Sequence, residues 1–152
     1  MPVISFHFEK FQAEKKKDLE APMKIDVGTK ITEVKEEDVN LNGGNVQKVL
    51  RFFYEHNIDY NPDQASISIS GNLVYYAPLA EVDEVLKEWK KSKKMSAEVT
   101  RVVLNTVLLR CQIKALMISQ DLGLPPHIRL PILKAGEPPK QKPKSPVSEY
   151  TG

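Results

Sequence analysis

The sequence predicts an α+β fold in which a four-stranded antiparallel sheet is covered by a short helix and a long C-terminal helix. Four segments in the first half alternate apolar and polar residues, a pattern typical of strands with one buried face. After Pro78 the apolar spacing changes to about 3.6 residues, and residues 96–123 form the longest uninterrupted helical pattern. A run of strands followed by a run of helices favours an antiparallel sheet with the helices gathered on one side.

The first two strands are predicted at residues 4–8 and 24–34. Phe11 falls out of phase with the alternation before it, which indicates a bulge or a bend. Residues 12–18 are polar and rich in lysine, as expected of a solvated edge strand or a loop. Residues 35–45 are acidic and then rich in glycine and asparagine, so we interpret them as a loop.

The third and fourth strands are predicted at residues 46–60 and 65–75. The apolar residues of the first of these segments also fit a helix, but their alternation over eleven positions and their aromatic side chains favour a strand. Between the two segments, Pro62 suits the second position of a type I turn. The alternation continues through Gly71, which favours one long strand with a glycine bend over a hairpin turn at that point.

Two helices complete the predicted fold. The first is short and amphipathic, at about residues 79–93. For the second, Ser96 is a suitable N-cap and Gly123 a suitable residue just past the C-terminus, because prolines follow that cannot continue the helix.

The long helix has more apolar surface than one face of a sheet can cover. At about 1.5 Å per residue it spans roughly 39 Å and crosses the whole domain. Its second apolar face needs another partner, so we expect a dimer or tetramer. The interface residues we predict are Val103, Val107, Leu108 and Leu116. Membrane insertion is not expected, because polar and charged residues interrupt the apolar run, among them Arg101, Arg110 and Lys114.

Composition places the chain among globular proteins with one domain. The 152 residues carry a net charge of +2, which we assign to a proline- and lysine-rich tail at 134–152, extended or disordered, beyond a neutral domain at 1–133. With a single cysteine, Cys111, the chain has no intrachain disulfide. The N-terminal residues do not resemble a secretion signal, so we expect a soluble, cytoplasmic protein.

No combination of residues in the sequence predicts an enzyme, a metal site or a cofactor. His7, His56 and His127 lack the spacing of metal ligands, and Cys111 is interpreted as a small core side chain. Aromatic strand residues are usually core, but they could also line a peptide groove or stack on RNA bases. The candidates for peptide binding are Phe52, Tyr54, Tyr75 and Tyr76.

The tail supports an alternative function. Four prolines interleave there with Lys140, Lys142 and Lys144, so the tail is either a disordered end or a tether that contacts an anionic surface such as ribosomal RNA. The chain would then be a ribosome- or RNA-associated accessory protein.

The sequence LEAP stands at residues 19–22, after the first predicted strand, and residues 24–29 and 49–51 lie in the strands that follow. These short segments, in order along the chain, resemble motifs of the SecB export-chaperone family. The helix end resembles the family most closely. The matching residues there are Arg110, Ile113, Leu116, then residues 123–126, Leu130 and Pro131. The resemblance covers most of residues 3–133, although the chain lacks the acidic character of the bacterial chaperone and has Ile132 and Leu133 where the family continues its motif.

This resemblance implies a SecB-like fold, oligomers formed through sheet edges and long helices, and binding of unfolded polypeptide in apolar grooves. An archaeal SecB-like protein of unassigned role would fit the same features. The sequence therefore predicts a non-enzymatic, holdase-type polypeptide-binding chaperone, with the ribosome-associated role as the alternative.

Overall fold

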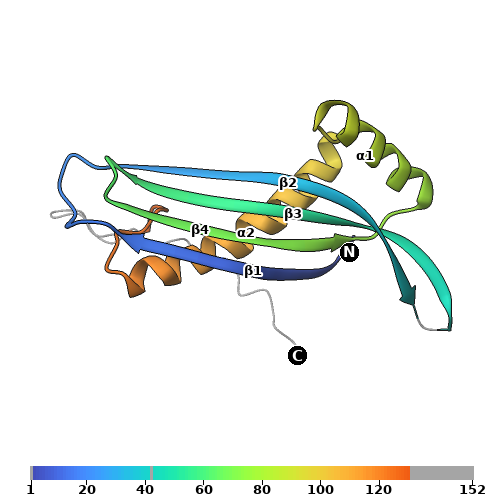
Figure 1. The fold of residues 1–152 in the computed structure, drawn as a ribbon, viewed down its shortest axis with the longest axis horizontal. Helices are drawn as coiled ribbons and strands as arrows, with labels where there is room; N and C mark the ends of the chain where they lie inside the picture. The colour runs from blue at the N-terminus through green and yellow to red at the C-terminus, as the bar shows by residue number, and fades with distance from the viewer. Residues whose placement is uncertain (1, 42, 131–152) are drawn as a thin grey trace, which may run out of the picture.

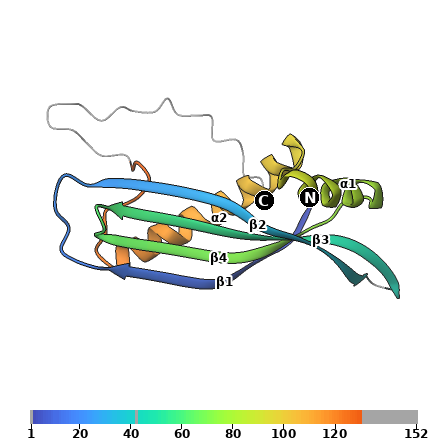
Figure 2. The same cartoon turned by 45° about the horizontal axis from the view of Figure 1, so that its top comes forward.

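A computed structural model describes residues 2–41 and 43–130 of the chain. It contains one antiparallel sheet in the order β1-β4-β3-β2, so that β1 and β2 are its edges (Figure 1). The helix α2 crosses one face of this sheet obliquely, and α1 packs near one end of it (Figures 1 and 2). The elements are β1 (Val3–Lys15), β2 (Lys24–Leu41), β3 (Asn45–Asn61), β4 (Ala65–Tyr75), α1 (Leu79–Ser92) and α2 (Ala97–Asp121). The predicted α+β class is confirmed.

A bulge in β1 keeps its aromatic residues on one face of the sheet. Phe8 lies opposite Gly71 and Phe11 opposite Ile69, so three steps along β1 match two along β4, and the extra residue lies at Glu9. The bulge expected from the position of Phe11 is confirmed. The polar continuation of this segment forms an edge strand as far as Lys15.

The expectation of a loop at residues 35–45 is wrong for residues 35–41, because β2 continues to Leu41 and pairs with the start of β3, and only Gly43 and Gly44 form a turn among the described residues of this range. Two of its acidic residues pair with cationic side chains of the neighbouring strand. Glu36 lies 2.5 Å from the Lys48 ammonium, and Glu37 accepts hydrogen bonds from the Arg51 guanidinium at 2.5 and 3.0 Å. Cross-strand pairs of opposite charge stabilise a ladder whose side chains alone would favour a loop.

The turn expected between β3 and β4 is present, but it is not of type I. Asp63 has a φ of 46°, in the left-handed region, whereas the third residue of a type I turn has a φ near −90°. The next residue, Gln64, is buried and exchanges hydrogen bonds of 2.9 and 3.0 Å with the main chain of Glu20. These bonds tie the β1–β2 connection to the turn.

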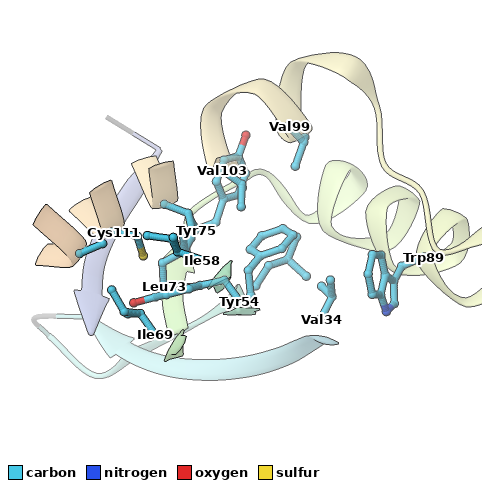
Figure 3. Packing of buried hydrophobic residues seen from close by; sticks show 14 of the residues in the cluster. Val34, Tyr54, Ile58, Ile69, Leu73, Tyr75, Trp89, Val99, Val103 and Cys111 are labelled. Atoms are coloured by element: carbon cyan, nitrogen blue, oxygen red, sulfur yellow. The ribbon is translucent and has the colours of Figure 1, made fainter. Parts of the chain in front are cut away.

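The core lies between α2 and the sheet face formed by alternate residues of β3 and β4 (Figure 3). The helix contributes one residue in every four along most of its length, and these side chains are small. They are Val99, Val103, Val107, Cys111, Ala115 and Ser119. At both ends of α2 the predicted signals are confirmed. Ser96 accepts a hydrogen bond from the amide of Val99, and Gly123 has a φ of 65°.

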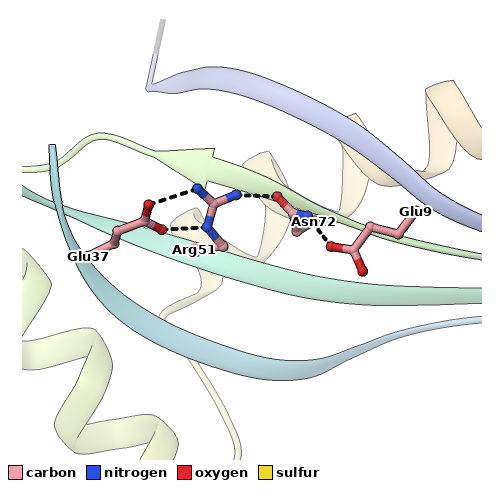
Figure 4. A network of polar contacts seen from close by, with 4 residues as sticks. All are labelled: Glu9, Glu37, Arg51 and Asn72. Carbon is pink, nitrogen blue, oxygen red and sulfur yellow. Dashed lines mark hydrogen bonds and ion pairs between the residues drawn. The ribbon is translucent and has the colours of Figure 1, made fainter.

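A polar chain crosses all four strands (Figure 4). Arg51 on β3 donates to Glu37 on β2 and to the side-chain oxygen of Asn72 on β4, and Asn72 donates to Glu9 in β1. The hydrogen bonds to Arg51 lower the pKa of Glu37, and those to Glu37 raise the pKa of Arg51. Because each strand contributes one residue, this network of hydrogen-bonded side chains favours a single register of the sheet.

Gly71 should be irreplaceable in this sheet, whereas Gly28 should not. A Cβ at Gly71 would collide with the main-chain oxygen of His7 and lie 2.5 Å from the Tyr54 hydroxyl, while one at Gly28 would meet nothing within 4 Å. We expect Gly71→Ala to lower the free energy of unfolding by roughly 3 kcal/mol or more. Gly28→Ala should leave it unchanged or raise it by about 0.5 kcal/mol, since alanine has less freedom in the unfolded chain.

Urea unfolding followed by Trp89 fluorescence would measure both variants. Equal stabilities for the two would contradict the close packing of β1, β3 and β4 at Gly71.

Candidate functional site

An apolar ridge runs along the side of α2 that faces away from the sheet. Leu109, Ile113 and Met117 are 62%, 57% and 54% exposed. Because they recur every four residues, they form one stripe of roughly 12 Å along the helix. We call these three residues the α2 ridge.

The residues predicted to form an interface on α2 lie elsewhere. Val103 and Val107 are fully buried against the sheet, and Leu108 and Leu116 are half-buried at the sides of the helix. The valines therefore cannot contact a second subunit while the chain is folded, and this part of the prediction is corrected. The α2 ridge is the exposed apolar face of the same helix.

Partly exposed aromatic side chains lie along β1 beside α2. The ring of Phe8 lies 5.1 Å from that of Phe6 and 5.2 Å from that of Phe11. Arg110 and Lys114 of α2 reach over this row, with Lys114 4.9 Å from the Phe11 centroid. Phe8 and Phe11 are nevertheless 37% and 45% exposed, so the apolar surface beside the β1 edge reaches solvent.

Three of the four predicted peptide-binding residues are core residues. Phe52, Tyr54 and Tyr75 are at most 5% exposed, because the alternation that predicts their strands turns them toward α2. Tyr54 also stacks on Phe6 and donates a hydrogen bond of 2.8 Å to a main-chain oxygen of β1. Only Tyr76, which is 40% exposed, lies at the surface. The predicted aromatic groove on β3 and β4 is therefore absent from the described residues.

A hollow lies instead between the middle of β2, the end of α1 and the start of α2. It has a volume of about 360 Å³ and combines apolar side chains with lysines. Its apolar lining includes Ile31, Trp89, Met95 and Leu104, and its lysines are Lys30, Lys93 and Lys94. A shallower neighbouring depression shares Ile31 and Trp89 and continues along β2 to Thr32. We call the first cavity the β2 hollow.

The strand edge next to the β2 hollow is open. β2 is the last strand of the sheet, so one of its edges has no hydrogen-bonded neighbour among the described strands. Val27, Gly28 and Lys30 are exposed there. A bulge between Ile31 and Glu33 interrupts the regular strand. Residues 24–31 thus present main-chain donors and acceptors that have no partner in the described part of the chain, beside an apolar cavity.

Within the described part of the chain, the buried cysteine and the possible metal ligands are candidates for covalent and metal chemistry. Cys111 is fully buried, and burial raises the pKa of its thiol to about 12, as expected for a core side chain rather than a nucleophile. In the ranges 2–41 and 43–130, no three His, Cys, Asp or Glu side chains lie close enough together to hold a metal ion.

Two histidines hold the segment after α2 against the sheet. The Nδ1 atom of His56 lies 2.6 Å from the Thr29 hydroxyl, and its ring centroid is 6.4 Å from that of His127. Close by, the Tyr60 hydroxyl donates a 2.7 Å hydrogen bond to the main-chain oxygen of Pro125. Nε2 of His56 and both ring nitrogens of His127 are buried without a hydrogen-bond partner in the described part of the chain. Both imidazoles therefore favour the neutral state.

Burial lowers the pKa of His56 to about 4, assisted by His127, and burial also lowers the pKa of His127. Above the usual histidine pKa, near 6.5, both rings are neutral whether the chain is folded or unfolded, so they add no pH dependence. Below it only the unfolded chain takes up protons, and stability falls as the pH decreases toward 4. For His56 the loss amounts to roughly 3 kcal/mol.

Urea unfolding at pH 7.5, 6 and 5 would test this expectation in the wild type and in His56→Gln. The difference in stability between the two proteins isolates the contribution of His56 from that of the carboxylates. His7→Gln is the control, because His7 is exposed. If His56→Gln showed the same slope with pH as the wild type, the buried neutral histidine would be refuted.

Two further expectations concern membranes and the tail. By length and composition alone, α2 is able to cross a bilayer, with a mean hydropathy of 1.5 in its most apolar window, so charged interruptions do not by themselves exclude a span. In the structure one side of α2 packs on the sheet.

Lys140, Lys142 and Lys144 lie outside the described residues, so the ribosome- or RNA-associated role stays a prediction.

No protein-family model matches the chain, and no curated protein matches it. Among solved structures, the chain is similar to the SecB-like chaperone Rv1957 of Mycobacterium tuberculosis, in complex with a ChAD peptide from the Rv1956 HigA1 antitoxin. The TM-score is 0.47 and the identity 14%, and the match covers 86% of this chain and 89% of that one.

Proposed function

We propose that this protein is a non-enzymatic, cytoplasmic holdase that binds unfolded polypeptide, as the SecB-like segments of its sequence imply. The observation that carries the proposal is the β2 hollow beside an open strand edge. An extended segment of another protein would hydrogen-bond to residues 24–31 and place an apolar side chain between Trp89 and Leu104. This is the geometry of β-strand addition.

Such a site distinguishes unfolded from folded proteins. Main-chain hydrogen bonds do not depend on the sequence of the client, whereas an extended segment with free donors and acceptors is common only in unfolded chains. Main-chain hydrogen bonds contribute little net binding free energy in water, because each one replaces a hydrogen bond to water. Burial of an apolar side chain in the cavity supplies the additional affinity. No catalytic group is required for this function.

Self-association through the α2 ridge completes the proposal. A second copy placed on Leu109, Ile113 and Met117 would remove them from water, and each fully buried large side chain contributes roughly 1.5–3 kcal/mol. The row of Phe8 and Phe11 extends the apolar area toward the β1 edge. We propose a dimer or tetramer formed through these surfaces.

The holdase function predicts that the protein suppresses aggregation and that this depends on the β2 hollow. We expect Leu104→Lys to reduce suppression several-fold, because a charged side chain in the cavity disfavours entry of an apolar group. Val46→Lys introduces the same charge at a valine that is 64% exposed and lies outside the hollow, so it should behave as the wild type. Light scattering of a client protein diluted from guanidinium provides the measurement.

Far-ultraviolet circular dichroism would establish that both variants are folded. Aggregation that proceeds unchanged in a molar excess of the wild-type protein would refute the holdase function.

The proposed interface predicts that Ile113→Lys dissociates the oligomer, because it places a charge in the centre of the α2 ridge. Sedimentation equilibrium should show a dimer or tetramer for the wild type and a monomer for the variant. Val107→Ala is the matched control. It should lower the free energy of unfolding by roughly 2 kcal/mol, since it leaves a cavity under the helix, without changing the oligomeric state. A wild-type protein that sediments as a monomer at its highest soluble concentration would exclude self-association.

A further inference from the structure

We infer that the β2 hollow selects extended segments in which a large apolar side chain is flanked by acidic residues. This inference rests on the proposed function and specifies its ligand. It follows from three features of the same site, namely the apolar floor, the lysines at its rim and the length of the open edge.

The floor of the hollow accepts one large apolar side chain. At about 360 Å³ the cavity exceeds the volume of any single side chain, and it opens to solvent between β2 and the helices. Its lining includes Trp89, only 8% exposed, and the half-buried Met95 and Leu104. An aliphatic or aromatic group entering here would meet carbon atoms from three elements, so its burial is favourable.

The rim carries positive charge that the described structure does not neutralise. Lys30, Lys93 and Lys94 are exposed, and none of them forms an ion pair with a carboxylate of residues 2–41 or 43–130. Lys24 and Lys35, on the same strand, pair with Asp26 and Glu33. The ammonium of Lys93 lies 5.3 Å from the centroid of the Trp89 ring, and both residues line the cavity. Lys30 lies opposite Glu55 in the strand pairing but forms no ion pair with it. A carboxylate bound near Lys93 and Lys94 would meet cations that have no ion-pair partner among the described residues.

The strand edge defines where those carboxylates would lie in a bound segment. Residues 24–31 pair regularly with β3 and the bulge after Ile31 ends the regular stretch, so the edge accepts a segment of about eight residues. Side chains alternate between the two faces of a strand. If an apolar residue enters the hollow, its immediate neighbours lie on the face of Lys30, and residues two positions away lie on the helix side, near Lys93 and Lys94.

A polypeptide fits this combination better than a nucleic acid does. Lysines alone would attract an acidic polypeptide and a nucleic acid alike. The open main-chain edge, however, offers donors and acceptors in the alternating pattern that a second strand matches, and a sugar–phosphate backbone has no amide donors to complete it.

The single tryptophan of the chain, Trp89, provides a direct measurement of binding. The full-length protein would be titrated with capped peptides of about eight residues that contain a central leucine flanked by glutamates. We expect a saturable change in Trp89 fluorescence. Replacing the glutamates by lysines, the leucine by alanine, or alternate amides by N-methyl amides should each weaken binding several-fold.

Charge reversal in the protein tests the role of the rim. Lys30→Glu combined with Lys94→Glu should abolish the preference for the acidic peptide and favour the lysine peptide. Lys10→Glu combined with Lys87→Glu changes the net charge equally at exposed lysines outside the hollow, and this double variant should keep the wild-type preference.

The outcomes separate this inference from the proposed function. Suppression of client aggregation together with equal affinity for the acidic and basic peptides would overturn the acidic preference and leave the holdase function intact. A protein that neither suppresses client aggregation nor binds either peptide would refute the holdase function itself. Saturable binding of single-stranded RNA at Trp89, with no binding of the acidic peptide, would also overturn the inference.

Discussion

The structure depends on how closely α2 packs against the sheet. One residue in every four along the helix faces β3 and β4, and toward its C-terminal end these are Cys111, Ala115 and Ser119. Small side chains let the helix axis approach the strands, where the large residues of the sheet fill the remaining space. Because the contacting stripe is narrow, most other apolar residues of α2 have no partner within the core.

The bulges of the two edge strands adapt the sheet to this packing. The bulge in β1 returns Phe11 to the face covered by α2, and the bulge in β2 lies between Ile31 and Glu33, beyond which Val34 enters the core. Each extra residue adjusts which side chains face the helix and interrupts the regular edge. The stretch of β2 that stays regular and open is the stretch beside the hollow, so one irregularity both completes the core and delimits the proposed binding edge.

Thr29 connects the proposed binding site to the segment that follows α2. Its side chain lines the β2 hollow and also hydrogen-bonds the buried His56, which lies beside His127. Protonation of either imidazole would disfavour this packing, because the unpartnered nitrogens have no acceptors among the described residues. The wall of the hollow and the path of residues 124–130 therefore share one pH-sensitive contact.

The sequence by itself determined the secondary structure of most of the chain and the α+β class. Alternation identified the strands, a change of period identified the helices, and Ser96 and Gly123 mark the ends of α2, because these signals depend on neighbours a few residues apart. Residues 35–41 were missed, since the cations that pair with Glu36 and Glu37 belong to another strand. Only the tertiary structure decided which side of the broadly apolar α2 is buried: Val107, expected at an interface, lies in the core, whereas Ile113 is exposed. It also brought β2, Trp89 and Leu104 together, because a cavity between elements far apart in sequence leaves no local pattern.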